Sequence, residues 1–379
     1  MDNIAGKKSA LTWAVHLSAA ALVLLWLLPT LGLFISSFRS GDQIAGSGWW
    51  MSLSAQEQQL PPIRISGEEV ERDGKFVIEG RLFDNENSAI SAWGTNVNRP
   101  TEFLPGAVAD LGDGLYLQVN EVGGYTLTSA TSLKDVRMPR IFTTATTPPE
   151  FTTDNYFNIF NNPSAGQSIG QAFLNTMTVA IPATIIPILI AAFAAYALAW
   201  MDFPGRALLI AAIVGLLVVP LQLALIPLLN FHNNIGIGKG YMGIWMAHTG
   251  FGLPLAIYLL RNYMVGLPRD IIENAKVDGA TDFQIFTKII LPLSFPALAS
   301  FAIFQFLWTW NDLLVALVFL GTGNDQLVLT GTLVNLMGSR GGDWEILSAS
   351  AFVSIAVPLV VFFALQRYLV RGLLAGSVK

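Results

Sequence analysis

Six apolar runs alternate with polar segments along the chain. Each run has about twenty residues or more and carries almost no charge, which suits an α-helix that crosses a hydrocarbon layer of ~30 Å at ~1.5 Å per residue. The runs are Ala14–Ser37, Phe173–Trp200, Ala207–Phe231, Tyr241–Leu260, Ala297–Leu320 and Leu347–Leu369. The pattern predicts an all-α membrane bundle of six transmembrane helices.

Two features of these runs refine the prediction. The first run follows Lys7 and Lys8 as in a signal peptide, but it is too long for one and lacks a convincing small-residue cleavage site, so we expect an uncleaved helix. Prolines inside the runs predict kinked helices, with the freed carbonyl groups satisfied by neighbouring helices. These prolines are Pro182, Pro187, Pro220, Pro227, Pro254 and Pro358.

A polar stretch from Arg39 to about Ser168 separates the first two runs. Its alternating segments Lys75–Phe83 and Gly114–Val119 predict short strands. Turn dipeptides punctuate them, namely Asp73-Gly74, Asp113-Gly114 and Gly123-Gly124. We therefore expect a small β-rich domain inserted between helices 1 and 2. The Ser-, Thr-, Gly- and Pro-rich flanks, Ser40–Pro62 and Thr143–Thr153, are typical of linkers.

Lysine and arginine in the short connections predict the orientation. With the N-terminus inside, ten of them fall on the cytoplasmic side: Lys7, Lys8, Arg206, Arg261, Arg269, Lys276, Lys288, Arg367, Arg371 and Lys379. Only Lys239 and Arg340 fall in the opposite short loops. Both termini of a multi-pass membrane protein are thus expected in the cytoplasm, with the insert on the opposite side. The expected domains are residues 1–38 (N-terminus and first helix), 39–168 (insert) and 169–379 (helices 2–6).

Composition removes several classes of function. Of 379 residues, 53% are hydrophobic and 12% charged, with a mean hydropathy of +0.54, which excludes an all-soluble protein. The net charge of −5 offers no basic surface for nucleic acid. The chain has no cysteine, and its three histidines lack metal-ligand spacing, so no metal site is expected. The segment Gly236–Gly240 lacks the order of a phosphate-binding loop, and no nucleotide-binding motif appears elsewhere in the sequence, so no cofactor is expected in this chain.

The connection 262–292 carries the most informative pattern. Ile271, Ile272 and Ala275 are spaced to share one face of a short helix, and Asp270, Glu273 and Lys276 the other. Asp278-Gly279 then predicts a turn, because glycine adopts a left-handed conformation without a Cβ penalty, and Asp278 is expected to cap the next turn. A second helix is expected to carry Phe283, Phe286 and Ile290 up to Leu291-Pro292. We therefore predict a helix-turn-helix at the cytoplasmic face.

Glu273, Ala275, Asp278, Gly279, Ile289, Leu291 and Pro292 have the spacing of the EAA loop of binding-protein-dependent ABC importer permeases, which the chain resembles. Asn274 departs from that motif, at a position that is permissive in the sugar branch. The resemblance implies that the loop is a coupling helix that docks into a cytoplasmic ATPase. The residues assigned to ATPase coupling are Glu273, Asn274, Ala275, Asp278, Gly279 and Ala280.

The resemblance extends over all six apolar runs and points to the carbohydrate branch, of maltose and alpha-glucoside type. It is carried by Asp154–Tyr156, Asn175-Thr176, Ala195–Leu198, Phe203–Arg206, Trp310-Asn311 and the tail 370–379. It implies a sugar importer permease without enzymatic activity. The implied partners are a second permease subunit, a homodimeric cytoplasmic ATPase that binds ATP, a periplasmic or lipid-anchored sugar-binding protein, and membrane lipid.

The residues that line the substrate path are harder to assign from the sequence than those of the loop 262–292. Trp308, Asn311, Asp312 and Gln222 are candidates because aromatic faces and polar groups suit sugar rings, although packing or interface anchoring explains the same residues. Asn175 and His248 are weaker candidates, since single polar residues often bridge helices instead.

The sequence leaves other functions open. The solute could be a polyol or glycerol phosphate, and the chain could instead be a membrane-anchored sensor. An ion-driven transporter would need more charge within the apolar runs. An intramembrane enzyme would need a nucleophile and base pair or a metal cluster, neither of which is present in the sequence.

Overall fold

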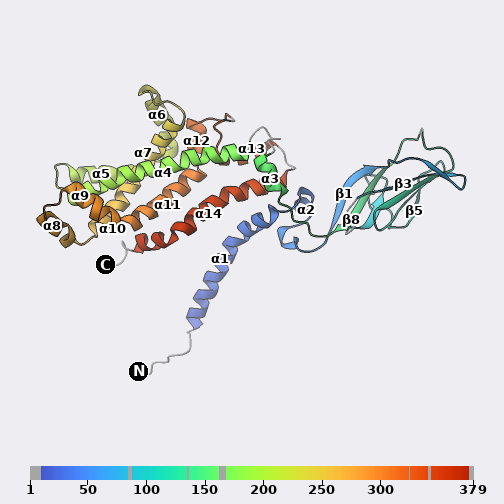
Figure 1. Cartoon of the computed structure of the whole chain (residues 1–379), viewed down its shortest axis with the longest axis horizontal. Helices are drawn as coiled ribbons and strands as arrows, with labels where there is room; N and C mark the ends of the chain where they lie inside the picture. The colour runs from blue at the N-terminus through green and yellow to red at the C-terminus, as the bar shows by residue number, and fades with distance from the viewer. Residues whose placement is uncertain are drawn as a thin grey trace, which may run out of the picture. The chain divides into compact units, whose positions relative to one another are not determined.

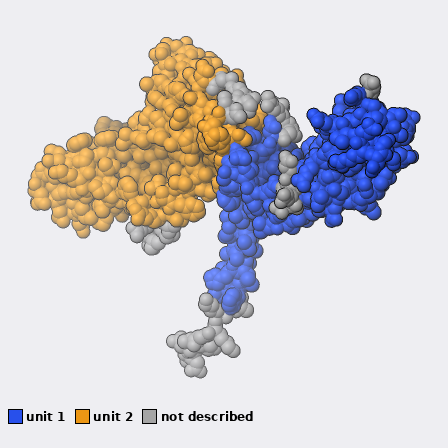
Figure 2. Space-filling model, turned by 45° about the vertical axis from the view of Figure 1, so that its right-hand side comes forward, with its two compact units in different colours: residues 1–155, 342–349 blue, residues 156–341, 350–379 orange. Residues whose placement is uncertain are grey.

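The computed structural model describes residues 10–83, 88–134, 136–161, 168–323, 325–339 and 343–374. Lys7, Lys8, Arg340 and the end of the predicted tail, 375–379, lie outside these residues. The chain divides into two compact units, residues 1–155 with 342–349 and residues 156–341 with 350–379 (Figure 2).

The first unit joins a long apolar helix to two small sheets (Figure 1). It begins with α1 (Ala10–Ser36), followed by the short helix α2 (Gly41–Gly46) and a 3₁₀ turn, Trp49–Met51. Its strands are β1 (Gln56–Arg64), β2 (Val70–Arg72), β3 (Lys75–Arg81), β4 (Ala89–Gly94), β5 (Val108–Asp110), β6 (Leu115–Val119), β7 (Gly124–Ser129) and β8 (Arg140–Thr147). The strands thus follow α1 in the chain, where the alternating pattern predicted them.

The strands form two antiparallel sheets, with orders β1-β8-β4 and β2-β3-β7-β6-β5. Side chains from both sheets share one apolar core, in which Trp93, Leu117 and Leu127 are fully buried. Two predicted turns have the expected geometry, since Asp73-Gly74 and Asp113-Gly114 both have positive φ at both residues, as tight hairpins require.

The flanks predicted to be linkers are ordered structure, so that prediction is wrong. Residues 56–62 belong to β1, and residues 143–147 belong to β8, the strand with which β1 pairs. Threonine is β-branched and favours strands, so the Thr-rich flank suits a sheet better than a linker. Pro61 and Pro62 fit because β1 is an edge strand whose register shifts between Leu60 and Ile63.

The second unit is helical. After α3 (Asp154–Asn161) come α4 (Ile169–Trp200), α5 (Arg206–Leu216), α6 (Leu221–Asn234), α7 (Tyr241–Val265) and α8 (Arg269–Val277). Next are α9 (Asp282–Ile285), α10 (Leu291–Leu293), α11 (Phe295–Asn311), α12 (Leu314–Phe319), α13 (Leu329–Ser339) and α14 (Trp344–Leu374). Helix α4 packs along both α7 and α11. Of the described helices, α1, α4, α7 and α14 are long and apolar enough to cross a membrane.

Two of the predicted spans are not single helices. The run Ala207–Phe231 is divided between α5 and α6, which are bent by 112°. Pro220 stands at the start of α6. Because proline disfavours the helical conformation of the residue before it, α5 does not continue into α6 as one helix. The run Ala297–Leu320 is also not one helix, because α11 ends at Asn311 and the short helix α12 covers the last part of the run. Helix α11 is bent by 69° from the preceding segment, Asp282–Leu293. Counting each bent pair as one span gives up to six spans among the described residues.

Prolines inside the helices leave carbonyl groups without their usual N–H donors, and for Pro182, Pro187 and Pro358 a side chain from a neighbouring helix replaces the donor. Proline at position i frees the carbonyl of residue i−4. Pro182 thus frees Thr178 O, which accepts from Trp245 Nε1 at 2.9 Å. Pro187 frees Ala183 O, which accepts from Gln305 Nε2 at 3.1 Å. These bonds tie α4 to α7 and α11, as the sequence predicted in general terms.

A third bond of this kind joins α11 to α14. Pro358 frees Ser354 O, which accepts from Trp310 Nε1 at 2.9 Å. The indole of Trp310 is 1% exposed. Trp310 is therefore a core residue with a defined hydrogen-bonding role.

Candidate coupling loop and transport path

Helix α8 turns one side toward the core of the helical unit and exposes the other. Ile272 is 3% exposed, and Ala275 is partly buried against the same apolar cluster. On the opposite side Glu273 and Asn274 are exposed, and Val277 is 86% exposed. One side of α8 is therefore packed on the helical core, and the other side exposes both polar and apolar side chains.

The face predicted for Ile271 is wrong. Ile271 is 40% exposed, whereas Ile272 is buried. Neighbouring residues of an α-helix lie about 100° apart around its axis, so they rarely share a narrow buried face. Ile271 adds to the exposed apolar surface of α8.

Gly279 ends α8 in a Schellman motif. Its backbone φ is +79°, its N–H donates to Lys276 O at 3.0 Å, and the N–H of Ala280 donates to Ala275 O at 3.0 Å. Ala275 and Ala280 both pack against the apolar cluster, which is the side-chain contact that accompanies this motif. The predicted glycine turn is confirmed, and the two alanines have a structural role that the sequence pattern did not reveal.

Thr281, not Asp278, caps the next helix. The hydroxyl of Thr281 accepts from the Gln284 N–H at 3.3 Å, and the Thr281 N–H donates to Gln284 Oε1 at 2.9 Å. This reciprocal pair is a capping box, for which Thr281-x-x-Gln284 is the sequence signature. Asp278 is exposed, at the end of α8.

A widened helical turn, Phe286–Ile290, carries the chain from α9 into α10. The N–H of Leu291 bonds to Phe286 O, five residues back, just before Pro292 interrupts the normal pattern. Phe286 is 3% exposed, and its ring centroid lies 4.6 Å from that of Phe193 and 5.3 Å from that of Tyr196. These rings anchor the loop on α4.

Asp282 connects three helices at this point. Its Oδ1 accepts from the Tyr196 hydroxyl of α4 at 3.3 Å and lies 3.7 Å from Lys276 Nζ of α8. Tyr196 is 5% exposed. A displacement of α8 or α9 therefore acts on α4 through both a polar link and the aromatic contacts of Phe286.

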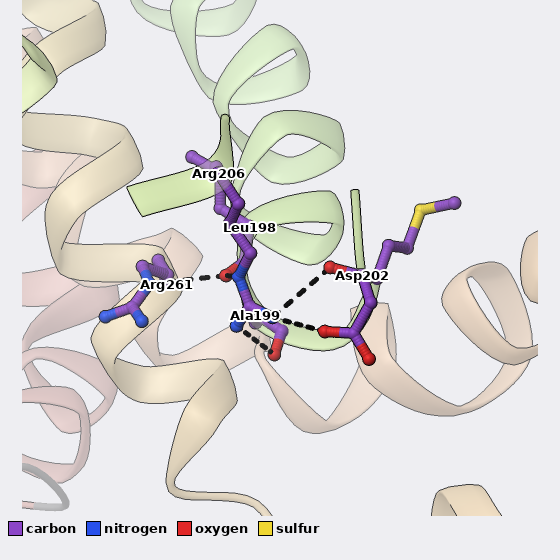
Figure 3. A network of polar contacts seen from close by, with 6 residues as sticks. Leu198, Ala199, Asp202, Arg206 and Arg261 are labelled. Carbon is purple, nitrogen blue, oxygen red and sulfur yellow. Dashed lines mark hydrogen bonds and ion pairs between the residues drawn. The ribbon is translucent and has the colours of Figure 1, made fainter. Parts of the chain in front are cut away.

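The end of α4 is held by two arginines (Figure 3). Arg206 donates from Nε to Leu198 O at 2.9 Å and from Nη2 to Ala199 O at 3.1 Å, and its Nη1 lies 3.0 Å from Asp202 Oδ1. Arg261 of α7 donates to the same Leu198 carbonyl at 3.4 Å. Positive groups at a helix C-terminus satisfy its free carbonyls and oppose its dipole.

Three of the four path candidates lie together at the end of α11. Trp308 is 43% exposed, and the exposed Asn311 donates to Leu307 O at 2.8 Å. Asp312 does not lie inside a helix, as the predicted span implied, but follows α11 and accepts from Val315 N–H at 3.0 Å, which caps α12. Gln222 lies on a different helix, α6, where it is exposed.

Two polar residues of α4 hold the segment before α13. Asn175 Nδ2 donates to Asp325 O at 2.9 Å and to Leu327 O at 3.0 Å, while Thr176 Oγ1 accepts from Leu329 N–H at 2.8 Å. Asn175 thus has a helix-bridging role. Among the described residues, no group of three or more His, Asp or Glu is placed to hold a metal.

A family model, described as "Binding-protein-dependent transport system inner membrane component", matches residues 172–374, from α4 to α14. The chain belongs to this family. The match begins after the strands β1–β8, so the permease core is shared with the family and the β-rich unit lies outside the matched region.

Named relatives of this family agree. The chain is 65% identical over 379 residues to "Alpha-glucoside transport system permease protein AglG" of Rhizobium meliloti (strain 1021), covering 98% of each chain. It is 53% identical over 287 residues to "Osmoprotective compounds uptake permease protein GgtD" of Synechocystis sp., covering 75% of this chain and 96% of the relative. These relatives are permeases and not enzymes, which confirms the ABC permease resemblance stated from the loop 262–292.

Among solved structures, the chain resembles a bacterial ABC transporter involved in the import of the acidic polysaccharide alginate. The TM-score is 0.48 at 21% sequence identity, covering 59% of this chain and 81% of the other.

Proposed function

We propose that the chain is the permease subunit of an importer for alpha-glucosides or related oligosaccharides. The observation that carries this proposal is the 65% identity to the alpha-glucoside permease, which covers 98% of both chains and therefore includes the β-rich unit that the family model leaves out. The partners would be a second permease subunit, a periplasmic or lipid-anchored sugar-binding protein and a homodimeric cytoplasmic ATPase that binds the ATP.

We further propose six membrane spans, formed by α1, α4, the bent pair α5 and α6, α7, the bent pair 282–293 and 295–311, and α14. Both termini would be cytoplasmic and the insert periplasmic, as the distribution of lysine and arginine favours. This topology puts α8 and α9 on the cytoplasmic side, where an ATPase can reach them.

The proposed coupling surface is the exposed side of α8. This side presents carboxylates, an amide and an apolar group to a partner, from Glu273, Asn274, Val277 and Asp278. The buried side chain of Ile272 packs the opposite side of the helix on the core. ATP-driven closure of the ATPase would displace α8, and the helices would re-pack so that the path opens outward to a loaded binding protein. A partner can shift the equilibrium between the two conformations of the permease only by the difference in its affinity for them. Weaker docking of the ATPase on α8 would therefore uncouple ATP use from transport.

Gly279→Asp tests the coupling role, with Gly236→Asp as the matched control. Both glycines have φ near +80°, and a Cβ at either meets no described atom within 4 Å, so the two substitutions impose the same backbone strain. In the reconstituted importer, we expect Gly279→Asp to lower sugar uptake per ATP hydrolysed and Gly236→Asp to retain the ratio. Equal ratios for the two variants would contradict the coupling role.

A substrate assay separates the two candidate solute classes. The relative named for osmoprotective compounds, at 53% identity, favours a small compatible solute such as a polyol derivative as the second candidate. In proteoliposomes containing the full assembly, alpha-glucosides should stimulate ATP hydrolysis and be taken up. Stimulation by a polyol or glycerol phosphate alone would replace the first candidate with the second.

The substrate path is proposed to pass Trp308 and Asn311, with Asp312 shaping the end of α11 and Gln222 contributing from α6. An exposed indole beside an amide provides a face for a sugar ring and a hydrogen-bonding group. We expect Trp308→Ala to raise the sugar concentration needed for half-maximal uptake, and Trp308→Phe to restore much of it. A purely structural Trp308 would alter stability in both variants without altering that concentration.

A further inference from the structure

A short turn after α1 and α2, residues 49–53, carries large apolar side chains that are exposed. Trp50 is 73% exposed, Met51 41% and Leu53 81%. The sheets begin only at Gln56, so these residues lie in the chain between α1 and the first strand. Because Trp50, Met51 and Leu53 are close in sequence, they form a group of exposed apolar side chains, and such a group marks an interaction site more often than singly scattered ones do.

The neighbouring residue fixes this turn along α1. Trp49 packs so closely on Gly32 that a Cβ built on the glycine would lie 2.6 Å from Trp49 Nε1. Only glycine leaves room for this indole, which places the turn beside the last part of α1, which ends at Ser36.

The position of Gly32 matches one edge of a bilayer. Trp13, 57% exposed, stands near the start of α1, and Gly32 follows it by 19 residues. At ~1.5 Å per residue this separation is about 29 Å, close to the ~30 Å thickness of a hydrocarbon core. Trp13 and the turn at Trp49–Leu53 therefore stand at the two levels where tryptophan is enriched in membrane proteins.

Buried hydrogen bonds hold the segment between α1 and the turn. Arg39, 2% exposed, donates from Nη2 to Gln43 O at 2.7 Å and to Ser47 Oγ at 2.6 Å, which closes the chain around one guanidinium. Asn155 Nδ2 donates to Ser37 O and Arg39 O, each at 2.9 Å, and holds the exit from α1. These bonds, together with the packing of Trp49 on Gly32, hold the start of the turn beside the end of α1.

We propose that Trp50, Met51 and Leu53 form a lipid anchor that enters the headgroup–acyl boundary of the membrane where α1 leaves it. The occupant is lipid because the turn is continuous with an apolar helix, lies at interface height and combines an indole with aliphatic groups, which suits a half-apolar, half-hydrated layer. The anchor ties the start of the β-rich unit to the membrane surface. The inference rests on the proposed membrane crossing of α1.

The absence of cysteine from the chain makes the test direct. Single variants Leu53→Cys, Leu22→Cys and Val122→Cys carry a fluorescent label in the reconstituted importer. Leu22 is 59% exposed within α1, and Val122 is 64% exposed in the turn between β6 and β7. Quenching by headgroup-labelled and deep-labelled nitroxide lipids is compared with quenching by aqueous iodide.

We expect the Leu53 label to be quenched most by headgroup-labelled lipid and to lose most of the iodide quenching seen at Val122. Adding Trp50→Ser should shift the Leu53 label back toward iodide. Iodide quenching at Leu53 equal to that at Val122, or protection from both lipid and iodide by a protein partner, overturns the lipid anchor. If the Leu22 label is not quenched by deep nitroxide, the crossing of α1 itself fails, which distinguishes the two failures.

Discussion

Gln305 replaces the hydrogen bond that Pro187 removes, and a double-mutant cycle can isolate this role. Gln305 is 1% exposed, and its Nε2 lies 3.1 Å from Ala183 O and 3.4 Å from His248 O. Gln305→Leu removes both bonds and leaves Ala183 O without a donor, because Pro187 has no N–H. Pro187→Ala restores a backbone donor for the same carbonyl. The cost of Gln305→Leu should therefore be smaller when residue 187 is alanine.

The expected magnitude follows from the fate of one buried carbonyl. An unsatisfied buried polar group costs about 1–3 kcal/mol, while side-chain hydrogen bonds between membrane helices contribute about 0.6 kcal/mol on average and up to about 1.7 kcal/mol. We expect Gln305→Leu to lower the free energy of unfolding by about 1–3 kcal/mol with Pro187 present. The coupling between the two sites should be about 1 kcal/mol, since the bond to His248 O is lost in both backgrounds.

The assay is reversible unfolding of the purified protein in mixed micelles, for the wild type, both single variants and the double variant. A crossed cycle of Gln305→Leu with Pro182→Ala is the matched control, because Pro182 frees Thr178 O, which accepts from Trp245. The changes in the free energy of unfolding caused by Gln305→Leu and Pro182→Ala should be additive. Equal costs of Gln305→Leu in both backgrounds, or equal coupling in the crossed cycle, would refute the reasoning.

Three further predictions concern the end of the helical unit that carries α8 and α9. Gly279→Asn should destabilise less than Gly279→Val, because a left-handed backbone costs most L residues about 1–2 kcal/mol and asparagine less; equal melting temperatures would contradict this. Tyr196→Phe removes the hydroxyl that reaches Asp282 but keeps the ring contact with Phe286, so uptake per ATP should fall without loss of folding; an unchanged ratio opposes the link. Arg206→Lys loses the bidentate contact with the α4 carbonyls, so amide hydrogen exchange in the last turn of α4 should accelerate, and unchanged protection would contradict the cap.

Local patterns in the sequence were sufficient for features that local chemistry determines. Apolar runs predicted α1, α4, α7 and α14, because a long uncharged helix has few alternatives to a membrane. Gly279 and Asp73-Gly74 were predicted as turns, since positive φ selects glycine and a few polar residues. The signature Thr281-x-x-Gln284 was also present in the sequence, but the cap was assigned to Asp278 and the capping box was missed.

Other features depend on neighbours that are distant in the chain. The flank predicted as a linker became β1 because β8, some eighty residues later, provides its hydrogen-bonding partner. Gln305 was missed because its role exists only where Ala183 lies beside it, 122 residues away in sequence. Asp312 was assigned to the substrate path from the sequence, whereas the structure shows that its carboxylate accepts from the Val315 N–H at the start of α12.

The sequence by itself thus determined which segments are apolar enough to leave water, where the helix-turn-helix of the proposed coupling loop lies and where glycine must turn the chain, since each depends on side-chain chemistry within a few residues. Only the tertiary structure decided how α5 and α6 bend, which donors satisfy the carbonyls freed by proline, and which faces of α8 are buried. Those outcomes depend on packing and hydrogen bonds between helices, which bring together residues that no local pattern relates.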